Sequence, residues 1–393
     1  MLNSSRKAAQ SFLGLNNVGD PHRLGLRWLT QADNVDITNN NALQRAKGFA
    51  RVANNTAVTG AYATQDFQRL YIADNGGLYL ITAADLSGPT LQTTLTSSRP
   101  VYFAEANNIV YYTNGIDYGS APPGGWRPWG IPNPRAPVFT LGNGSLDAGL
   151  YAVVCTFVDN KGLESGNSPP LEITVPANKA LLIADIEQRT GYTTNIYVTM
   201  PNATIYYLIA ENAPAAVNWG GGTLGRELPY WNTSPPRGSF PALFQGQLYC
   251  AEPFQAQDIS IIWRSLPLHY HHFDYSKEGF VVTGEVLFMH SPDDKTLIIG
   301  TDADVIAFDG DKQWSLSGYG VVPGWHASIN AGKLYFWTLR GLCRAMPFEN
   351  LTESSVSVPP GLSAGGMVLE KDGMRRYVVA LQKGGEAYNR RSS

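Results

Sequence analysis

Short apolar runs broken by Gly, Asn, Asp and Pro dominate the chain, and a helix-like pattern occurs only in the segments 6–13 and 26–33. One unit recurs: an apolar strand, a polar turn and a second apolar strand. It occupies the segments 69–80, 108–118, 247–263, 295–308 and 333–344, with a truncated copy at 376–381. Asn75-Gly76 and Asn114-Gly115 are dipeptides typical of tight hairpin turns, because both residues tolerate positive φ. The pattern predicts an all-β protein built from hairpins.

The spacing of this unit indicates the architecture. The strand centres lie at Ile72, Val110, Leu248, Ile298, Leu334 and Val378, which gives separations of 38, 138, 50, 36 and 44 residues. Four of these five gaps match the ~40–50 residues of a β-propeller blade. We therefore expect a β-propeller of about five to six blades. The alternative is an irregular all-β sandwich whose hairpins happen to be similarly spaced.

The long gap predicts an inserted domain. Removing one blade of ~45 residues from it leaves ~90 residues, about the size of one immunoglobulin-like sandwich. Linkers rich in Pro, Gly and Trp, at 121–137 and 220–236, flank this segment. Alternation at Tyr151, Val153, Cys155 and Phe157 predicts a half-buried strand, and the run that ends in Gly162-x-Glu164-Ser165 resembles fibronectin type III-like domains. The expected domains are 1–130 (N-terminal arm and first blades), 131–230 (inserted immunoglobulin/fibronectin III-like β-sandwich) and 231–393 (remaining blades and C-terminal tail).

Composition agrees with this prediction. Charged residues make up 16% of the 393 positions, and the chain holds 40 Gly and 25 Pro, which excludes a coiled coil, a helical bundle and an acidic disordered chain. The net charge is −3. Residues 1–60 sum to +4 and residues 370–393 to +3, so the middle carries −10. The basic ends either dock on an acidic neighbour or are solvated tails.

Targeting signals and disulfides are not expected. Cys155, Cys250 and Cys343 are too few and too separated for a disulfide framework or a zinc site, which favours reduced core residues in a protein assembled in cytosol. The first residues lack the long apolar segment of a signal peptide. Apolar runs fall short of the ~18 residues of a membrane-spanning helix.

Motifs that could carry chemistry have simpler explanations. Gly220, Gly222 and Gly225 match G-x-G-x-x-G, but no helix pattern follows, so we expect a loop. On a strand, His269 and His271 of the His-Tyr-His-His run would share a face and could bind a metal with a third ligand such as Asp274. The aromatic neighbours of that run favour a loop packed on a blade. Four acids that flank a strand lack the spacing of a calcium loop and are read as a solvated hairpin edge: Asp302, Asp304, Asp309 and Asp311.

No catalytic apparatus is evident. A Gly-x-Ser-x-Gly elbow and a phosphate-binding loop are missing from the sequence, and the acids fall mostly in turns rather than in pairs. We expect no enzyme activity, and no catalytic, cofactor-binding or metal residue. The alternative is a propeller that binds or hydrolyses polysaccharide on an aromatic platform, for which the candidates are Trp126, Trp129, Trp219, Trp231 and Trp325.

The N-terminal region resembles a known family. The carrying residues are Gly14-Leu15-Asn16, Pro21, Arg23-Leu24, Ala32, Asn34-Val35-Asp36-Ile37, Leu43, Arg45 and Gly48, and the segments 240–265, 297–301, 319–325 and 332–341 carry matching blade patterns. Together they resemble the tail hub, or nozzle, β-propeller proteins of short-tailed (podovirus-like) bacteriophages. The turn at 39–42 has Asn and Ala where that family usually has Gly.

This resemblance implies a structural virion protein, made in the host cytoplasm and located in the tail. Such nozzles form a homo-oligomeric ring, commonly a hexamer, below the portal–adaptor proteins; they extend the DNA ejection channel and support tail fibres or spikes and needle proteins. Genomic DNA would pass through the ring without sequence-specific binding, and six copies would sum to −18, which repels DNA. A receptor-binding or polysaccharide-binding propeller protein is the alternative.

Overall fold

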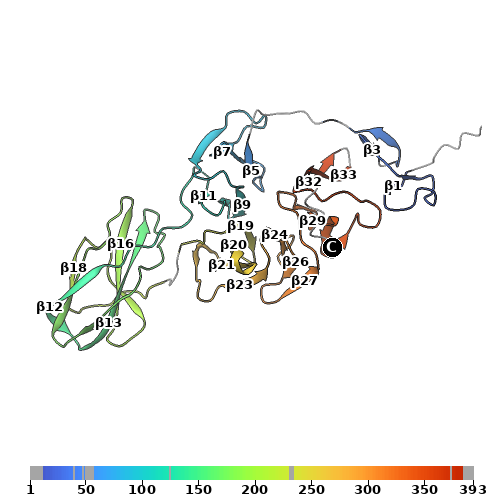
Figure 1. Cartoon of the computed structure of the whole chain (residues 1–393). Helices are drawn as coiled ribbons and strands as arrows, with labels where there is room; N and C mark the ends of the chain where they lie inside the picture. Colours follow the sequence, from blue (N-terminus) through green and yellow to red (C-terminus); the bar gives the residue numbers. More distant parts are fainter. Residues whose placement is uncertain are drawn as a thin grey trace, which may run out of the picture.

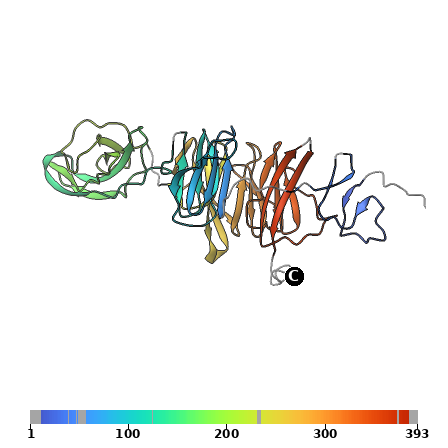
Figure 2. The ribbon, with the colours of Figure 1, turned by 90° about the horizontal axis from the view of Figure 1, so that it is seen from above.

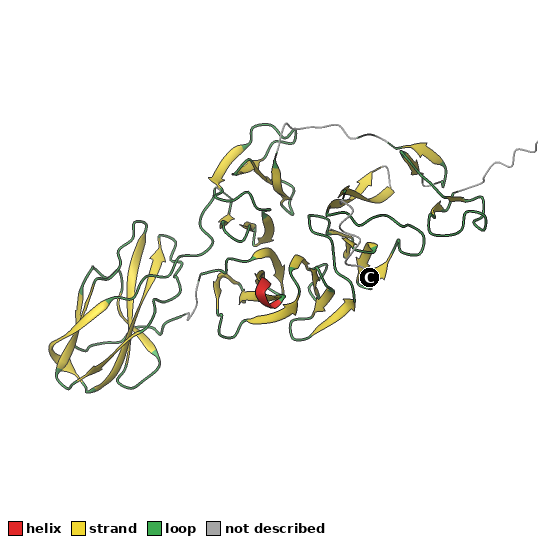
Figure 3. Ribbon diagram, in the orientation of Figure 1, coloured by secondary structure: helices red, strands yellow, loops and turns green. Residues whose placement is uncertain are grey.

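The structure is a computed structural model that describes residues 12–38, 40–46, 48, 57–123, 125–229, 234–371 and 374–383. Regular structure in this part of the chain is almost entirely β, and the one helical element is a 3₁₀ turn, η1 (Gln255–Gln257) (Figure 3). The segment 26–33 was expected to have helical character, and this is wrong. It contains β2 (Trp28–Leu29), which pairs in parallel with β1 (Gly14–Leu15). Most of the other helix-like segment, 6–13, lies outside the described residues.

Six antiparallel sheets follow one another along the described chain (Figure 1). The first contains β5 (Val58–Ala63), β6 (Leu70–Asp74), β7 (Gly77–Ile81) and β8 (Thr90–Thr94). The second contains β9 (Tyr102–Ala106), β10 (Ile109–Thr113) and β11 (Tyr118–Ala121). The third contains β19 (Ser239–Phe244), β20 (Gln247–Phe254), β21 (Ile259–Leu266), β22 (His269–Phe273) and β23 (Gly279–Thr283).

The remaining three sheets complete the series. The fourth contains β24 (Val286–His290), β25 (Leu297–Thr301), β26 (Val305–Phe308) and β27 (Gln313–Ser317). The fifth contains β28 (Ser328–Asn330), β29 (Lys333–Thr338), β30 (Gly341–Ala345) and β31 (Glu349–Asn350). The sixth contains β32 (Ser363–Lys371) and β33 (Met374–Gln382).

Apolar clusters lie between consecutive sheets and bind them face to face. Tyr71 and Val110 belong to the cluster between the first and second sheets, and Phe244 and Leu297 to that between the third and fourth. Equivalent clusters join the second sheet to the third, the fourth to the fifth, and the fifth to the sixth. These five clusters join the six sheets in series around a common axis, which is the arrangement of a β-propeller, because no sheet could bury its own apolar faces alone.

The repeated unit read from the sequence falls at the same place in every sheet. Its six predicted strand centres lie on β6, β10, β20, β25, β29 and β33, the second strand of each sheet. Five of these strands are largely buried, and β25 is buried at all five of its residues; β33 is the exception, with exposed and half-buried residues only among those described. A near-continuous apolar run followed by a turn is therefore the signature of the strand at the centre of each sheet.

An insert separates the second sheet from the third. Its three-stranded sheet contains β12 (Val138–Leu146), β15 (Lys179–Ala184) and β18 (Val217–Trp219). Its four-stranded sheet contains β14 (Leu171–Val175), β13 (Gly149–Asp159), β16 (Tyr192–Thr199) and β17 (Tyr206–Ala210). Side chains from both sheets, including Val153, Leu181 and Ile196, form one core between them, so the insert is a β-sandwich.

The N-terminal arm lies at the opposite end of the molecule from the insert (Figures 1 and 2). It consists of the β1–β2 pair and a hairpin of β3 (Val35–Ile37) and β4 (Leu43–Arg45). Asn17 exchanges side-chain hydrogen bonds with the backbone of Ser357 in the loop after β31. The N-terminal residues of the family resemblance thus fold outside the propeller, whereas its other segments, 240–265, 297–301, 319–325 and 332–341, lie within it.

Candidate functional site

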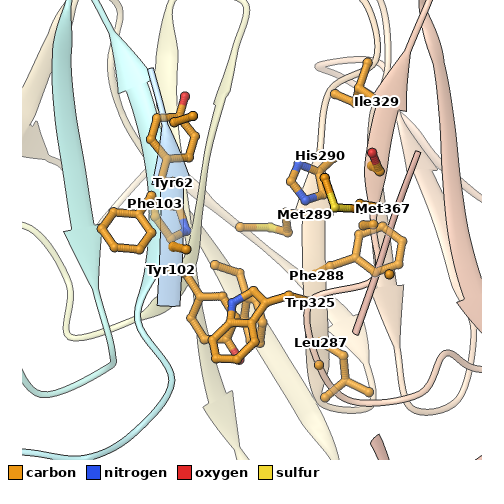
Figure 4. Close-up of a pocket in the computed structure, with 18 residues that line it drawn as sticks. Tyr62, Tyr102, Phe103, Leu287, Phe288, Met289, His290, Trp325, Ile329 and Met367 are labelled. Atoms are coloured by element: carbon orange, nitrogen blue, oxygen red, sulfur yellow. The ribbon is translucent and has the colours of Figure 1, made fainter. Parts of the chain in front are cut away.

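The first strand of each sheet borders a cavity on the propeller axis, with a volume of about 450 Å³. In each of the six sheets the first strand is the one that faces the cavity. The lining therefore consists mainly of short segments of β5, β9, β19, β24, β28 and β32. Aromatic side chains fill much of it: the rings of Tyr102 and Phe240 lie 4.0 Å apart and those of Tyr102 and Trp325 lie 5.9 Å apart. Phe288, Met289 and Met367 also line this space (Figure 4), and Phe288 and Met289 belong to the apolar clusters on the two sides of the fourth sheet.

Polar groups are few in this axial cavity. Burial raises the pKa of Tyr102 to about 12 and lowers the pKa of His290 to about 4, so both side chains are neutral at pH 7. The described residues that line the cavity include no Asp or Glu. Glycoside hydrolysis uses two carboxylates that face one cavity, and this wall does not supply them.

The axial cavity is also too small to conduct a nucleic acid duplex. The major groove of B-DNA alone is about 12 Å wide. A cavity of about 450 Å³, walled by aromatic side chains, cannot admit it. A DNA channel, if this protein forms one, must run between subunits and not through one of them.

A second cavity, of about 650 Å³, lies where the insert meets the third sheet. Leu163, Glu164 and Asn195 of the insert line one side of it, and His269 and His271 of β22 line the other. The His-Tyr-His-His run is therefore a strand, and not the loop that the sequence favoured. Its expected aromatic surroundings are present: Trp129 packs edge-on against Phe273 and donates a hydrogen bond of 2.7 Å to the carbonyl of Tyr270.

Glu164 is the centre of a polar network at this junction. Its side chain is 7% exposed and accepts hydrogen bonds from Thr156, Tyr197 and Asn195, while Arg226 Nη1 lies 2.9 Å from Oε2. A buried carboxylate needs such donors, since its desolvation is otherwise costly. Burial, with the hydrogen bond to Glu164, raises the pKa of Tyr197. In the sequence Glu164 stands only within a fold motif, and nothing in the local pattern indicates this role.

Three histidine rings gather beside this network. The ring centroids of His271 and His272 lie 4.0 Å apart, and the Nε2 atom of His272 lies 2.8 Å from the carbonyl oxygen of Glu164. Desolvation lowers the pKa of His271 to about 3 and that of His272 to about 4, so both imidazoles are neutral at pH 7. Asp274, the third ligand suggested by the sequence, instead caps the following turn through the backbone and hydroxyl of Ser276.

The other sequence candidates stabilise local structure. The glycine motif at 220–225 lies in the loop after β18, as predicted. Asp309 accepts hydrogen bonds from the backbone of Asp311 and Lys312, and Asp302 from that of Glu285. Because the two pairs of acids lie at opposite ends of β26, they form no common site.

The three cysteines are buried and unpaired, and burial raises the pKa of the Cys155 thiol to about 12.

The tryptophans do not form a single platform. Trp129 is buried against β22, Trp219 packs against the insert core, and Trp325 lines the axial cavity. Trp126 donates a hydrogen bond to the hydroxyl of Tyr112 on the second sheet, and Trp231 lies outside the described residues. Four of the five candidates thus occupy four separate places.

The arm exposes apolar side chains. Leu26 is 83% exposed, and four further aliphatic residues are also exposed: Leu13, Val18, Val35 and Leu43. Arg23 projects into solvent beside them, with its guanidinium 3.6 Å from Asp20. Exposed apolar side chains concentrated on a small appendage are typical of a surface that a partner covers.

Comparisons with known proteins assign no family. No family model and no curated protein matches this chain. Among solved structures, an inactive virginiamycin B lyase from Staphylococcus aureus with quinupristin is 13% identical, covering 83% of this chain and 92% of that one at a TM-score of 0.33. Apo AztD from Citrobacter koseri is 14% identical, covering 81% and 89% at a TM-score of 0.29. Likenesses at such TM-scores carry no argument about function.

The described residues form no helix of the length and apolar character needed to cross a membrane.

Proposed function

We propose that this chain is a structural virion protein of a short-tailed phage: a subunit of the tail nozzle or hub ring below the portal–adaptor, without enzymatic activity. In this proposal the arm docks on a neighbour in the ring. The observation that carries it is the arm itself, because the N-terminal residues of the family resemblance fold outside the propeller and the arm exposes apolar side chains. A protein that acted alone would gain nothing from exposing these side chains to water.

The six sheets are read as six blades and the insert as a fibronectin type III-like domain. In the immunoglobulin-type sandwich, strands C, F and G are neighbours in one sheet and B, E and D in the other. β13, β16 and β17 neighbour one another in the same way, as do β12, β15 and β18. The match supports the reading of the insert, although β18 comes last in the chain where strand D would come earlier.

The elongated subunit supports a place in a ring. The arm and the insert project from opposite ends of the propeller (Figure 2). A subunit of this shape can contact a neighbour at one end and present the insert at the other, where fibres or spikes would attach. Because DNA cannot thread the axial cavity, we assign the channel in this proposal to the centre of a cyclic oligomer.

The docking role of the arm is tested with matched surface variants. Leu26→Asp places a charge on the arm, and Phe67→Asp does the same at an 85% exposed position in the first sheet. We expect Leu26→Asp to weaken binding of the purified chain to its portal–adaptor ring at least tenfold, and Phe67→Asp to leave binding unchanged. Equal binding by both variants and the native chain would remove the arm from the interface.

A further inference from the structure

We propose that His269, His271 and His272 form a binding site for one divalent transition-metal ion, of the zinc class, at the junction of the propeller and the insert. Each histidine offers one ring nitrogen, and these three atoms lie within 4.8 Å of one another. In tetrahedral zinc sites with bonds of 2.0–2.1 Å, two nitrogen ligands lie about 3.3 Å apart. Small rotations of the three rings would bring them to that separation.

An irregularity in β22 brings the three rings together. In a regular strand His272 would point to the face opposite His269 and His271. Here Leu266 of β21 pairs with His269, whereas the preceding residue, Ser265, pairs with Phe273. Two consecutive residues of β21 therefore pair with residues that are four positions apart on β22. This irregularity is a bulge, and a bulge changes the direction in which side chains point. The result is a centroid separation of 6.1 Å between His269 and His272 and 6.3 Å between His269 and His271.

The hydrogen bond from His272 fixes which of its nitrogens can bind a metal. The carbonyl of Glu164 can only accept, so the His272 Nε2–H donates to it at 2.8 Å and the lone pair lies on Nδ1. Metal-binding histidines typically donate their other ring N–H to a carbonyl or carboxylate in this way. The Nε2 atom of His271 is buried and makes no hydrogen bond to any described residue, which leaves a second nitrogen for an ion.

The cavity at the junction provides access and an open position. His269 and His271 line it, so a bound ion would keep a coordination position that water can fill. The Glu164 carboxylate is already held by its four donors and is not a ligand. Arg127 and Asp159 lie with His271 against the neighbouring cavity. Three imidazoles favour Zn²⁺, Co²⁺, Ni²⁺ or Cu²⁺ over Mg²⁺ or Ca²⁺.

A metal here would stiffen the junction. All three ligands belong to the third sheet, but His272 is joined to the insert through Glu164. An ion that locks the His272 ring also fixes the direction of that hydrogen bond. The site would therefore couple metal binding to the orientation of the insert.

The test uses the full chain, stripped with a chelator and titrated with Co²⁺ and Zn²⁺. We expect one Co²⁺ per chain, visible absorption bands of tetrahedral intensity, and their loss when Zn²⁺ displaces Co²⁺. His269→Gln and His271→Gln each remove one ligand and should weaken binding by more than the ~10–100-fold typical of changing a residue that only orients a metal ligand. His22→Gln, at an exposed position of the arm, is the matched control.

Circular dichroism and a melting curve establish that each variant is folded. His269→Gln and His271→Gln are chosen because their rings line the cavity, whereas His272 is buried and its loss would damage the fold. Folded native protein that takes up no stoichiometric Co²⁺ would overturn the proposal. So would His269→Gln and His271→Gln variants that bind as tightly as the native chain.

Discussion

The guanidinium of Arg376, on the last described strand, lies 2.9 Å from the carboxylate of Asp36 in the N-terminal arm. This ion pair joins residues 340 positions apart in the chain. Asp36 belongs to the Asn-Val-Asp-Ile segment of the family resemblance. The arm is thus held on the sixth sheet by Asp36, one of the residues that carry the family resemblance. Asp36 therefore has a structural role that does not depend on any partner.

We expect Arg376→Gln to loosen the arm without unfolding the propeller. Both side chains are partly exposed, so the pair contributes about 1 kcal/mol or less to the free energy of unfolding. Limited proteolysis should cut the arm faster in this variant than in the native chain, with little change in melting temperature. Arg340→Gln, which breaks an exposed pair with Glu353, is the control. Identical cleavage rates in all three proteins would contradict the assignment.

Stability should fall as the pH falls from about 6.5 to about 4, because His326 is buried as a neutral ring. It is 0% exposed; its Nδ1 accepts a hydrogen bond of 2.9 Å from the backbone N–H of Trp337, and its Nε2 lies 2.5 Å from the carbonyl of Val322. Burial lowers its pKa from 6.5 to about 4. In this window the unfolded chain binds a proton that the folded chain does not, so the unfolded state is favoured by up to about 3 kcal/mol at the acid end.

His326→Gln tests that contribution directly. A glutamine amide can replace both hydrogen bonds but does not titrate. Unfolding by denaturant at pH 7 and pH 4.5 should show a smaller loss of stability on acidification for this variant than for the native chain. An unchanged difference between the two pH values would show that His326 is not the group responsible.

Glu164→Gln should destabilise the insert. The substitution removes the negative charge of a carboxylate that accepts hydrogen bonds from four donors. The glutamine amide has only one oxygen, so its NH₂ group must face some of these donors, from which it cannot accept a hydrogen bond. We expect a loss of about 2–4 kcal/mol, by analogy with charged hydrogen bonds and buried ion pairs that lose one member. Glu172→Gln, on the exposed face of β14 in the same sheet, should cost nearly nothing. Thermal unfolding followed by tryptophan fluorescence distinguishes the two; equal melting temperatures would count against the network.

Charge reversal on the arm should weaken docking if an acidic neighbour receives it. Arg23→Glu with Arg27→Glu changes the net charge by −4, as does the control pair Lys161→Glu with Arg189→Glu on exposed turns of the insert. Sedimentation with the portal–adaptor ring at two salt concentrations measures the effect. Loss of binding only in the arm variant is expected, whereas an equal effect in both would point to overall charge. Arg6 and Lys7, which add to the basic end, lie outside the described residues.

Local patterns were enough to predict the repeated sheets. Leu248 and Ile298, for example, lie in apolar runs that end at polar turns. This local pattern is sufficient to predict a central strand of a sheet from the sequence. β2 was missed because its two residues are strand only through their pairing with β1, a contact that the local pattern around Trp28 does not encode.

The junction could not be predicted in the same way. Alternation along β22 places His272 away from His269 and His271, and only the bulge opposite Ser265 and Leu266 overrides it. Register shifts depend on what packs against a strand, here Trp129 and the insert. Glu164 likewise gains its partners from β16 and from Arg226, 62 residues further along the chain.

The central claim is that this chain is a ring subunit completed by its neighbours. Its most direct test is native mass spectrometry of the purified full chain, alone and after mixing with its portal–adaptor ring. We predict a monomer alone and about six copies on each ring. A chain that stays free in the presence of the ring would contradict the nozzle assignment, and glycan binding would then be the property to measure.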